Sequence, residues 1–149
     1  MKTIGNVPAV VHETITVCSD GEYYSENITD AVQEIVERSG VIDGSAIVFL
    51  KHTTGALMLL EHEIGVLVDI EDTLEAVVRH KDEYLHHLRK VDNNGKAHVL
   101  NSMLNSSAAV PIQSGRLGLG EFQDIVFMDF QPRRVEREIN VTVTGIGDG

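Results

Sequence analysis

The feature that most constrains the fold is an alternating segment near the end of the chain. Within residues 135–146, the apolar side chains of Ile139, Val141 and Val143 alternate with polar or charged neighbours. Successive side chains of a β-strand point to opposite faces of a sheet, so this period of two predicts a strand with one buried face. The pattern therefore predicts that the end of the chain belongs to a β-sheet.

Other segments add strands to this sheet. Residues rich in Val, Ile and Thr, or runs of apolar residues, predict further strands at 9–18, 45–51, 56–61, 108–113 and 121–130. The glycine-rich segment Gly115–Gly120 precedes a strand rather than a helix, so phosphate-loop mechanisms do not apply to it. We predict instead that it joins two strands as a hairpin.

Helical periodicity of apolar residues predicts three helices, at 27–39, 66–79 and 97–104. Asn27 or Thr29 is suited to cap the start of the first helix, and Gly40 is suited to end it. The polar stretch 80–95 is long for a structureless loop, and such loops are often functional. Strands and helices neither alternate regularly nor segregate fully, so the predicted class is α+β.

Composition limits the classes of protein that the chain can belong to. Its 149 residues have the length of one ordinary domain, so we predict a single domain over 1–149. Cys18 is the only cysteine, which excludes an internal disulfide and a cysteine-rich zinc site. No apolar run is long enough to cross a bilayer and no signal peptide is recognisable, so we expect a cytoplasmic protein without membrane partners.

The charge of the chain bears on its partners. The formal net charge is −11, which argues against nucleic acid as a partner because binding to phosphates depends on Lys and Arg. This charge does not exclude a small anionic ligand that a few local donors hold.

Histidine is the residue type that points most directly to chemistry. Six of the seven histidines lie between residues 52 and 98. Imidazole is the commonest metal ligand and the natural acid–base group near neutral pH. His52 follows an apolar strand, His98 begins a predicted helix, and at most one of the adjacent His86 and His87 can face a given site. Taken singly, each is equally well explained as a surface side chain, and we treat the remaining three as such: His12, His62 and His80.

Two carboxylates accompany these histidines. Glu61 ends an apolar run, where a buried carboxylate needs water, a cation or a metal. Asp69 lies near the predicted start of the helix 66–79, where it either complements the helix dipole or belongs to a site. Three histidines with one or two carboxylates suit Zn²⁺ or another divalent first-row metal, and carboxylates with water suit Mg²⁺. We therefore predict one polar site formed by His52, His86, His98, Glu61 and Asp69.

The order of several short segments carries a family resemblance. These segments are Lys51–Ala56, Glu61, Val68-Asp69, Tyr84–His86, Ala97–Leu104, Ser107, Val110-Pro111, Gly115-Arg116, Gly120–Gln123 and Arg137. In this order and spacing, the chain resembles the YjbQ-like family, also known as the secondary thiamine-phosphate synthase family. No single segment is diagnostic, but the series covers nearly the whole chain.

The resemblance implies a fold, an assembly and an activity. It implies a compact α+β domain with a mixed or antiparallel sheet and two to three helices, assembled as a homotrimer. The implied activity joins a pyrimidine diphosphate to a thiazole phosphate and releases pyrophosphate, which makes the protein a transferase of small phosphorylated molecules. The implied roles are catalysis by His52, Glu61 and Asp69, binding of a divalent metal (Zn or Mg) by His52, His86 and His98, and substrate or phosphate contact by Ser107, Arg116, Gln123 and Arg137.

The sequence departs from the family pattern at three positions. Leu60 replaces a usual Asn before the glutamate, Asn105 replaces a usual Gly, and Phe122 replaces a usual Trp. Two alternatives to the synthase remain open. One is a homotrimer that binds a metal or a small ligand, including a metal-dependent hydrolase. The other is a structural or interaction protein.

Overall fold

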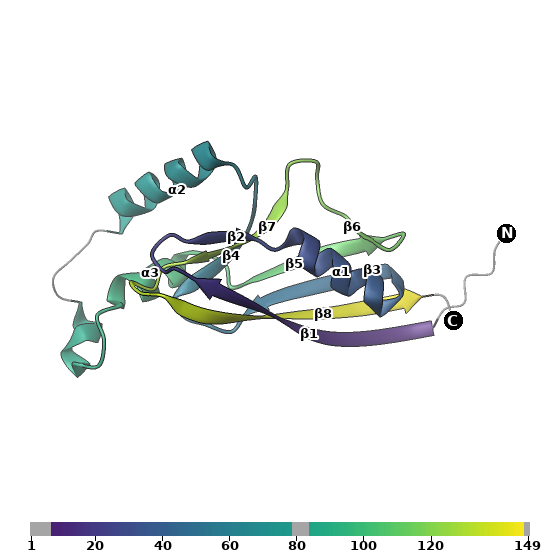
Figure 1. Cartoon of the computed structure of the whole chain (residues 1–149), viewed down its shortest axis with the longest axis horizontal. Helices are drawn as coiled ribbons and strands as arrows, with labels where there is room; N and C mark the ends of the chain where they lie inside the picture. The colour runs from purple at the N-terminus through teal and green to yellow at the C-terminus, as the bar shows by residue number, and fades with distance from the viewer. Residues whose placement is uncertain (1–6, 79–83, 148–149) are drawn as a thin grey trace.

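The fold of the chain is α+β, built on two antiparallel sheets (Figure 1). A computed structural model describes residues 7–78 and 84–147. One sheet has the strand order β1-β8-β3-β5-β6 and the other has the order β2-β7-β4. The strands are β1 (Val7–Ser19), β2 (Ser25–Asn27), β3 (Val41–Leu50), β4 (Gly55–Leu60), β5 (Ser107–Gln113), β6 (Arg116–Leu117), β7 (Asp124–Asp129) and β8 (Val135–Gly147). The predicted fold class and the main strands are confirmed.

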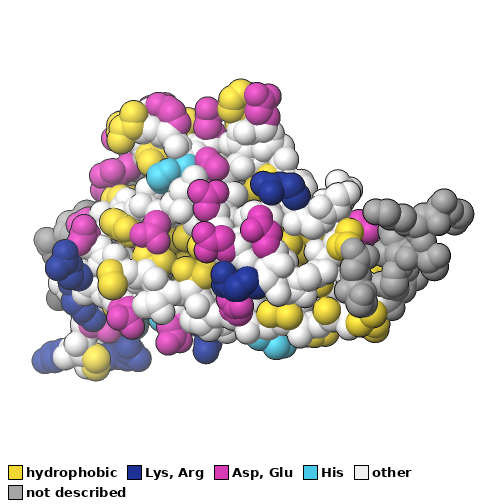
Figure 2. Space-filling view, turned by 45° about the vertical axis from the view of Figure 1, so that its right-hand side comes forward, with side chains coloured by type: hydrophobic (Ala, Val, Ile, Leu, Met, Phe, Trp, Pro, Cys, Tyr) yellow, Lys and Arg dark blue, Asp and Glu magenta, His cyan; other side chains and the backbone are white. Residues whose placement is uncertain are grey.

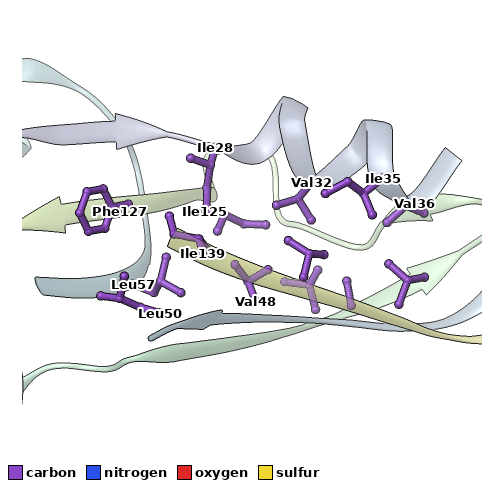
Figure 3. Packing of buried hydrophobic residues seen from close by; sticks show 14 of the residues in the cluster. Ile28, Val32, Ile35, Val36, Val48, Leu50, Leu57, Ile125, Phe127 and Ile139 are labelled. Atoms are coloured by element: carbon purple, nitrogen blue, oxygen red, sulfur yellow. The ribbon is translucent and has the colours of Figure 1, made fainter. Parts of the chain in front are cut away.

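The alternating segment forms β8, between β1 and β3. Ile139, Val141 and Val143 are fully buried on the inner face of the sheet. Figure 3 shows their layer, in which side chains from the first helix and from both sheets point toward one another. The hydrophobic core thus lies between the five-stranded sheet on one side and the first helix with the second sheet on the other. The apolar residues of the alternating segment therefore form one face of this core, as the period of two predicts.

The first helix, α1 (Thr29–Ser39), packs on this core with Val32, Ile35 and Val36. Asn27 Oδ1 accepts a hydrogen bond from the Thr29 backbone N–H at 3.1 Å. The helix ends at Gly40, whose φ of 71° is left-handed and suits glycine. The prediction for Gly40 is confirmed. The residue at the cap position of the helix start is Ile28, which makes no side-chain cap bond, so the predicted cap at Asn27 or Thr29 is wrong.

The second helix, α2 (Ile64–Val77), begins two residues earlier than predicted. Glu63 caps it by accepting hydrogen bonds from Gly65 N and Val66 N, and these bonds lower the pKa of the Glu63 carboxyl. Asp69 is the sixth helical residue, so the predicted position of Asp69 near the helix start is wrong. Leu74 is the buried residue of α2, which lies to one side of the sheets in Figure 1.

The remaining helical elements are a short 3₁₀ helix, η1 (Leu85–Arg89), and α3 (Gly95–Met103). The 3₁₀ helix falls within the polar stretch for which the sequence predicts only a loop. His80 lies outside the described residues. No helix in the described part of the chain is long and apolar enough to cross a membrane.

The glycine-rich segment makes a different connection from the one predicted. The turn at residues 114–115 joins β5 to the short strand β6, with Gln113 opposite Arg116. The next strand, β7, does not continue this hairpin and pairs with β2 and β4 in the second sheet. The prediction of a hairpin across Gly115–Gly120 is therefore wrong, because periodicity shows which face of a strand is buried but not which sheet the strand joins.

We expect Ile139→Ala to destabilise the fold by about 2–5 kcal/mol, because it leaves a cavity in the fully buried core. Ile64→Ala is the matched control, since Ile64 is 74% exposed and its truncation should change stability by about 0.5 kcal/mol or less. Urea unfolding of both variants measures the difference. Equal free energies of unfolding would contradict the assignment of the inner face.

Candidate functional site

The loop between β3 and β4 is fixed from two sides. His52 Nε2 accepts a hydrogen bond from the Glu138 backbone N–H at 3.0 Å, which ties the loop to β8. Asn101 of α3 donates through Nδ2 to the Gly55 carbonyl oxygen at 2.8 Å. Because its backbone groups have partners, the loop holds its side chains at defined positions.

A buried ion pair lies beneath this loop. Arg137 Nε and Nη2 donate to the two carboxylate oxygens of Asp129, each at 2.8 Å, and Nη2 also donates to Thr54 Oγ1 at 2.6 Å. Arg137 is 5% exposed and Asp129 is fully buried. Such a two-pronged contact is the strongest form of arginine–carboxylate interaction. It joins the end of β7, the start of β8 and the residue before β4.

His86 and His98 are in direct contact, with ring centroids 4.5 Å apart and planes at 60°. His86 Nε2 lies 3.0 Å from Asp92 Oδ1 and 3.1 Å from Asn94 Oδ1. His98 hydrogen-bonds to the Thr53 backbone, which brings the histidine pair next to the loop that carries His52.

The close approach of η1 to α3 makes this contact possible. Gly95 begins α3 at a point where an added Cβ would lie 2.6 Å from the Tyr84 Cβ. The Gly95 backbone N–H donates to His87 Nε2 at 3.0 Å, so His87 supports the start of α3. Of the two adjacent histidines, His86 is therefore the one that faces His98, in agreement with the prediction that only one of two neighbouring residues faces a given site.

Burial sets the charge of two of these imidazoles. Burial lowers the pKa of His98 below its ordinary value, and the nearby His86 contributes to this shift. Burial also lowers the pKa of His52, and the positive charge of Arg137 acts in the same direction. Both shifts favour the neutral imidazole near pH 7. Because His52 Nε2 accepts from the Glu138 backbone and His98 bonds to the Thr53 backbone, each ring has one nitrogen left for a further contact.

A pocket of about 790 Å³ opens at the histidine pair. Its walls are the end of α2, η1 and α3, and its lining residues are Val77, Val78, Tyr84, Leu85, His86, Leu88, Gly95, His98, Val99 and Met103. Most of these side chains are apolar, and the polar side chains are those of His86, His98 and Tyr84. Apolar walls with few polar groups are typical of sites for small organic molecules.

The predicted carboxylates lie away from this pocket. Glu61 is exposed at the end of β4, and neither Glu61 nor Asp69 is among the residues that line the histidine pocket. Asp69 is exposed on α2 and lines a second pocket of about 400 Å³ with other residues of α2, Met58 of β4 and Leu104, which follows α3. Of the five predicted site residues, the structure thus brings His86 and His98 together and places His52 on the adjoining loop.

The predicted phosphate-binding residues are dispersed. Ser107 is exposed at the start of β5, opposite Phe49. Arg116 is exposed with its Nη1 3.7 Å from Glu37 Oε1. Gln123 Oε1 accepts a hydrogen bond from Gly120 N at 2.8 Å and so stabilises the turn before β7. Arg137 is directed inward to Asp129, so it supports the site from below and does not face solvent.

The histidines as placed do not fit a metal centre within one chain. Among the residues that the structure describes, no three His, Cys, Asp or Glu side chains group so that they could hold one ion. The Nε2 atoms of His52 and His86 are already engaged with Glu138 N and with Asp92. No step of the proposed chemistry therefore passes through a metal.

Five residues of this region do not emerge from the sequence: Thr54, Asp92, Asn94, Asp129 and Gln131. Asp129 carries a usable signal, because a carboxylate at the end of the apolar run from Ile125 needs a buried partner. The sequence assigns Asn94 only to the polar stretch before the third helix. The partners of these residues come from distant segments, which no local pattern identifies.

Comparison with known proteins shows the family. The family described as UPF0047 protein YjbQ-like matches residues 13–146. The chain belongs to the UPF0047 family of YjbQ-like proteins. A UPF0047 protein of Archaeoglobus fulgidus is 39% identical over 113 residues, which cover 76% of this chain and 86% of that protein. One of Methanothermobacter thermautotrophicus is 36% identical and covers 80% and 81%. The resemblance inferred from the sequence is confirmed.

Solved structures of similar proteins share the fold. A protein of unknown function from Sulfolobus solfataricus P2 superposes with a TM-score of 0.87 at 30% identity, covering 93% of this chain and 99% of that one. A hypothetical protein from Aeropyrum pernix K1 gives a TM-score of 0.83 at 28% identity, covering 91% and 98%. The two-sheet architecture of the UPF0047 chain is therefore common to these relatives.

The donor geometry predicts a low metal content. Protein purified without an affinity tag should contain well below one equivalent of Zn²⁺ per chain by elemental analysis, because the described residues offer no three-ligand set. One full equivalent that is lost in both His86→Ala and His98→Ala would contradict this expectation and restore the metal site that the sequence suggests.

Proposed function

We propose that this UPF0047 protein is a transferase that joins a pyrimidine diphosphate to a thiazole phosphate, as its family resemblance implies. The observation that carries the proposal is the largely apolar pocket at His86 and His98. Its apolar walls suit a planar heterocycle, and its imidazoles suit the polar atoms of such a ring.

In the proposed reaction, the ring nitrogen of the thiazole forms a bond to the methylene carbon of the pyrimidine. The bond from that carbon to the diphosphate oxygen breaks, and pyrophosphate leaves with the electron pair. His98 is neutral, and because its N–H is engaged with the Thr53 backbone, its other ring nitrogen shares a proton with an amino group of the pyrimidine. Arg89, exposed with Nη2 3.5 Å from His86 Nε2, is a cation beside this pair that suits the pyrophosphate.

The proposal places the chemistry on fewer residues than the family resemblance implies. His98 and His86 act in the pocket, and His52 positions the loop through Glu138. Glu61, Asp69 and Arg116 lie elsewhere on this chain, so the proposal assigns them no step. The protein acts as a cytosolic enzyme on small phosphorylated substrates.

A thiamine phosphate assay with both precursors tests the function. We expect His98→Ala to reduce turnover about 10²–10⁴-fold, the range for loss of a group that transfers or shares a proton. His62→Ala is the matched control, because His62 lies between β4 and α2 and does not line the histidine pocket, so this variant should retain full activity. An undiminished rate in His98→Ala, or no product from the wild type, would overturn the proposal.

We also propose that the protein is a homotrimer whose copies meet on the outer face of the five-stranded sheet. Three cross-strand rows on this face contain no Asp, Glu, Lys or Arg: Val10, Thr144, Ser45, Pro111; His12, Thr142, Ile47, Ala109; and Thr14, Asn140, Phe49, Ser107. Ile47 is 44% and Phe49 is 47% exposed. Loss of charge with retained apolar side chains is typical of interface cores.

The charge of the chain supports a second copy as the partner on this face. Each chain carries a formal net charge of −11, and acidic side chains are spread over the surface in Figure 2. Two such chains repel each other least where neither presents a carboxylate. A cationic partner, in contrast, would favour the acidic surface over this uncharged sheet face.

Light scattering coupled to gel filtration tests the assembly. Phe49→Glu should shift the wild-type trimer to smaller species, because it places a charge in the uncharged face. Phe122→Glu is the control, since Phe122 is 66% exposed in the turn before β7 and lies off this face. A monomeric wild type, or a Phe49→Glu variant that stays trimeric, would contradict the proposal.

A further inference from the structure

We infer that Asp92, Asn94 and Gln131 are positioning residues that hold His86 in its Nε2–H tautomer, so that Nδ1 is the ring nitrogen left to accept a hydrogen bond from a ligand. The inference rests on the proposed function only in taking the histidine pocket as the ligand site. It does not depend on the reaction.

The first constraint on His86 comes from a carboxylate. Asp92 Oδ1 lies 3.0 Å from His86 Nε2, and an ionised carboxylate can only accept hydrogen bonds. His86 Nε2 must therefore carry a hydrogen to make this contact. Asp92 and His86 are largely shielded from solvent, with 22% and 26% of their side chains exposed, so water competes weakly for the same hydrogen.

The side-chain amide of Asn94 also requires a hydrogen on His86 Nε2. With a hydrogen on His86 Nε2, the atom of Asn94 that lies 3.1 Å away must be the carbonyl oxygen Oδ1. The Nδ2 group of Asn94 then points to Gln131, and it donates to Gln131 Oε1 at 3.0 Å. Asn94 is 7% and Gln131 is 6% exposed, so neither amide can turn over without leaving a buried group unpaired.

Gln131 connects Asn94, and through it His86, to the buried ion pair. Its backbone N–H donates to Asp129 Oδ1 at 2.9 Å, and Asp129 is the carboxylate of the buried ion pair with Arg137. Gln131 thus acts on His86 only through Asn94. The orientation of each polar group from Asp92 to Gln131 follows from its neighbour.

One neighbour opposes this tautomer. Arg89 Nη2 lies 3.5 Å from His86 Nε2, and a guanidinium can only donate. Two acceptors at 3.0 and 3.1 Å outweigh one donor at the limit of hydrogen-bond distance, because hydrogen bonds weaken steeply with length. The lone pair of neutral His86 is then on Nδ1.

This arrangement specifies a chemical class of ligand. A ring nitrogen that accepts a hydrogen bond recognises a donor, such as an exocyclic amine on a planar heterocycle. If a ligand presents only acceptor atoms to His86, a lone pair of the ligand faces the lone pair of His86 Nδ1, and no hydrogen bond forms. The pocket should therefore discriminate for donor-bearing rings at this position.

Nitrogen NMR of histidine tautomers tests the inference directly. Protein with ¹⁵N-labelled histidine, purified with a chelator to remove metal, is measured at a pH that gives neutral imidazole. The His86 signals are identified by their loss in His86→Gln. We expect His86 to show a protonated Nε2, an unprotonated Nδ1 and no detectable Nδ1–H form.

The variant Asp92→Asn tests whether Asp92 determines the tautomer of His86. It keeps the size of the side chain but adds an N–H donor, so the Nδ1–H form should become detectable and the Nδ1 signal should shift toward the protonated position. Asp20→Asn is the control, because Asp20 pairs with the exposed Arg134 and should leave His86 unchanged. An Nδ1–H or mixed tautomer in the wild type, or an unchanged spectrum in Asp92→Asn, would overturn the inference.

These readouts stay separate from the proposed activity. A fixed Nε2–H tautomer in a protein without synthase turnover would overturn the proposed function and leave the inference intact. Synthase turnover with a mixed tautomer of His86 would support the proposed function and overturn the inference. If Asp92→Asn does not fold, the wild-type spectrum alone still decides whether His86 is held in one form.

Discussion

The rest of the structure depends on the buried ion pair between Arg137 and Asp129. It joins the end of β7 in one sheet to the start of β8 in the other, and Thr54 adds the loop before β4. The two charges satisfy each other with paired hydrogen bonds, which is the condition under which a buried ion pair is tolerated. A buried charge without its partner would cost several kcal/mol. The pair therefore fixes how the two sheets meet beneath the site.

Hydrogen bonds, one ring contact and one step along the backbone lead from this pair around the site and back to it. Asp129 binds the Gln131 backbone, Gln131 binds Asn94, and Asn94 faces His86. The circuit then passes through His98 to the Thr53 backbone and returns by way of its neighbour Thr54 to Arg137. No buried side-chain polar atom among the described residues lacks a hydrogen-bond partner. Closed networks of this kind hold functional groups in place, because moving one member breaks bonds elsewhere.

Helices and strands that depend on neighbouring residues in the sequence can be predicted from the sequence alone. The alternation in β8, the periodicity of α1 and the glycine at its end each depend on side chains close in sequence. The pairing of strands depends on distant contacts, which is why the sequence alone joins β7 to the wrong hairpin. The predicted start of α2 is misplaced because nothing in the local pattern marks Glu63 as its cap.

The candidate site shows the same division. Histidine is rare and chemically distinctive, so its clustering along the chain points to candidates, and the family resemblance singles out His52, His86 and His98 among them. Asp92, Asn94 and Gln131 are common surface residue types, and their roles arise only when the chain brings them together. The family resemblance assigns Arg137 to phosphate contact, a role that needs an exposed guanidinium. In the structure, the Arg137 guanidinium is buried against Asp129 and turned away from solvent.

The central claim is that the Asp129–Arg137 pair organises the meeting of the two sheets, and a double-mutant cycle tests it most directly. Asp129→Leu, Arg137→Met and the double variant are unfolded in urea. Each single change should cost about 3–5 kcal/mol, because it leaves a buried charge unpaired. The double variant should cost clearly less than the sum, with a coupling energy of about 2 kcal/mol or more. Additive losses, or single losses of less than about 1 kcal/mol, would contradict the account.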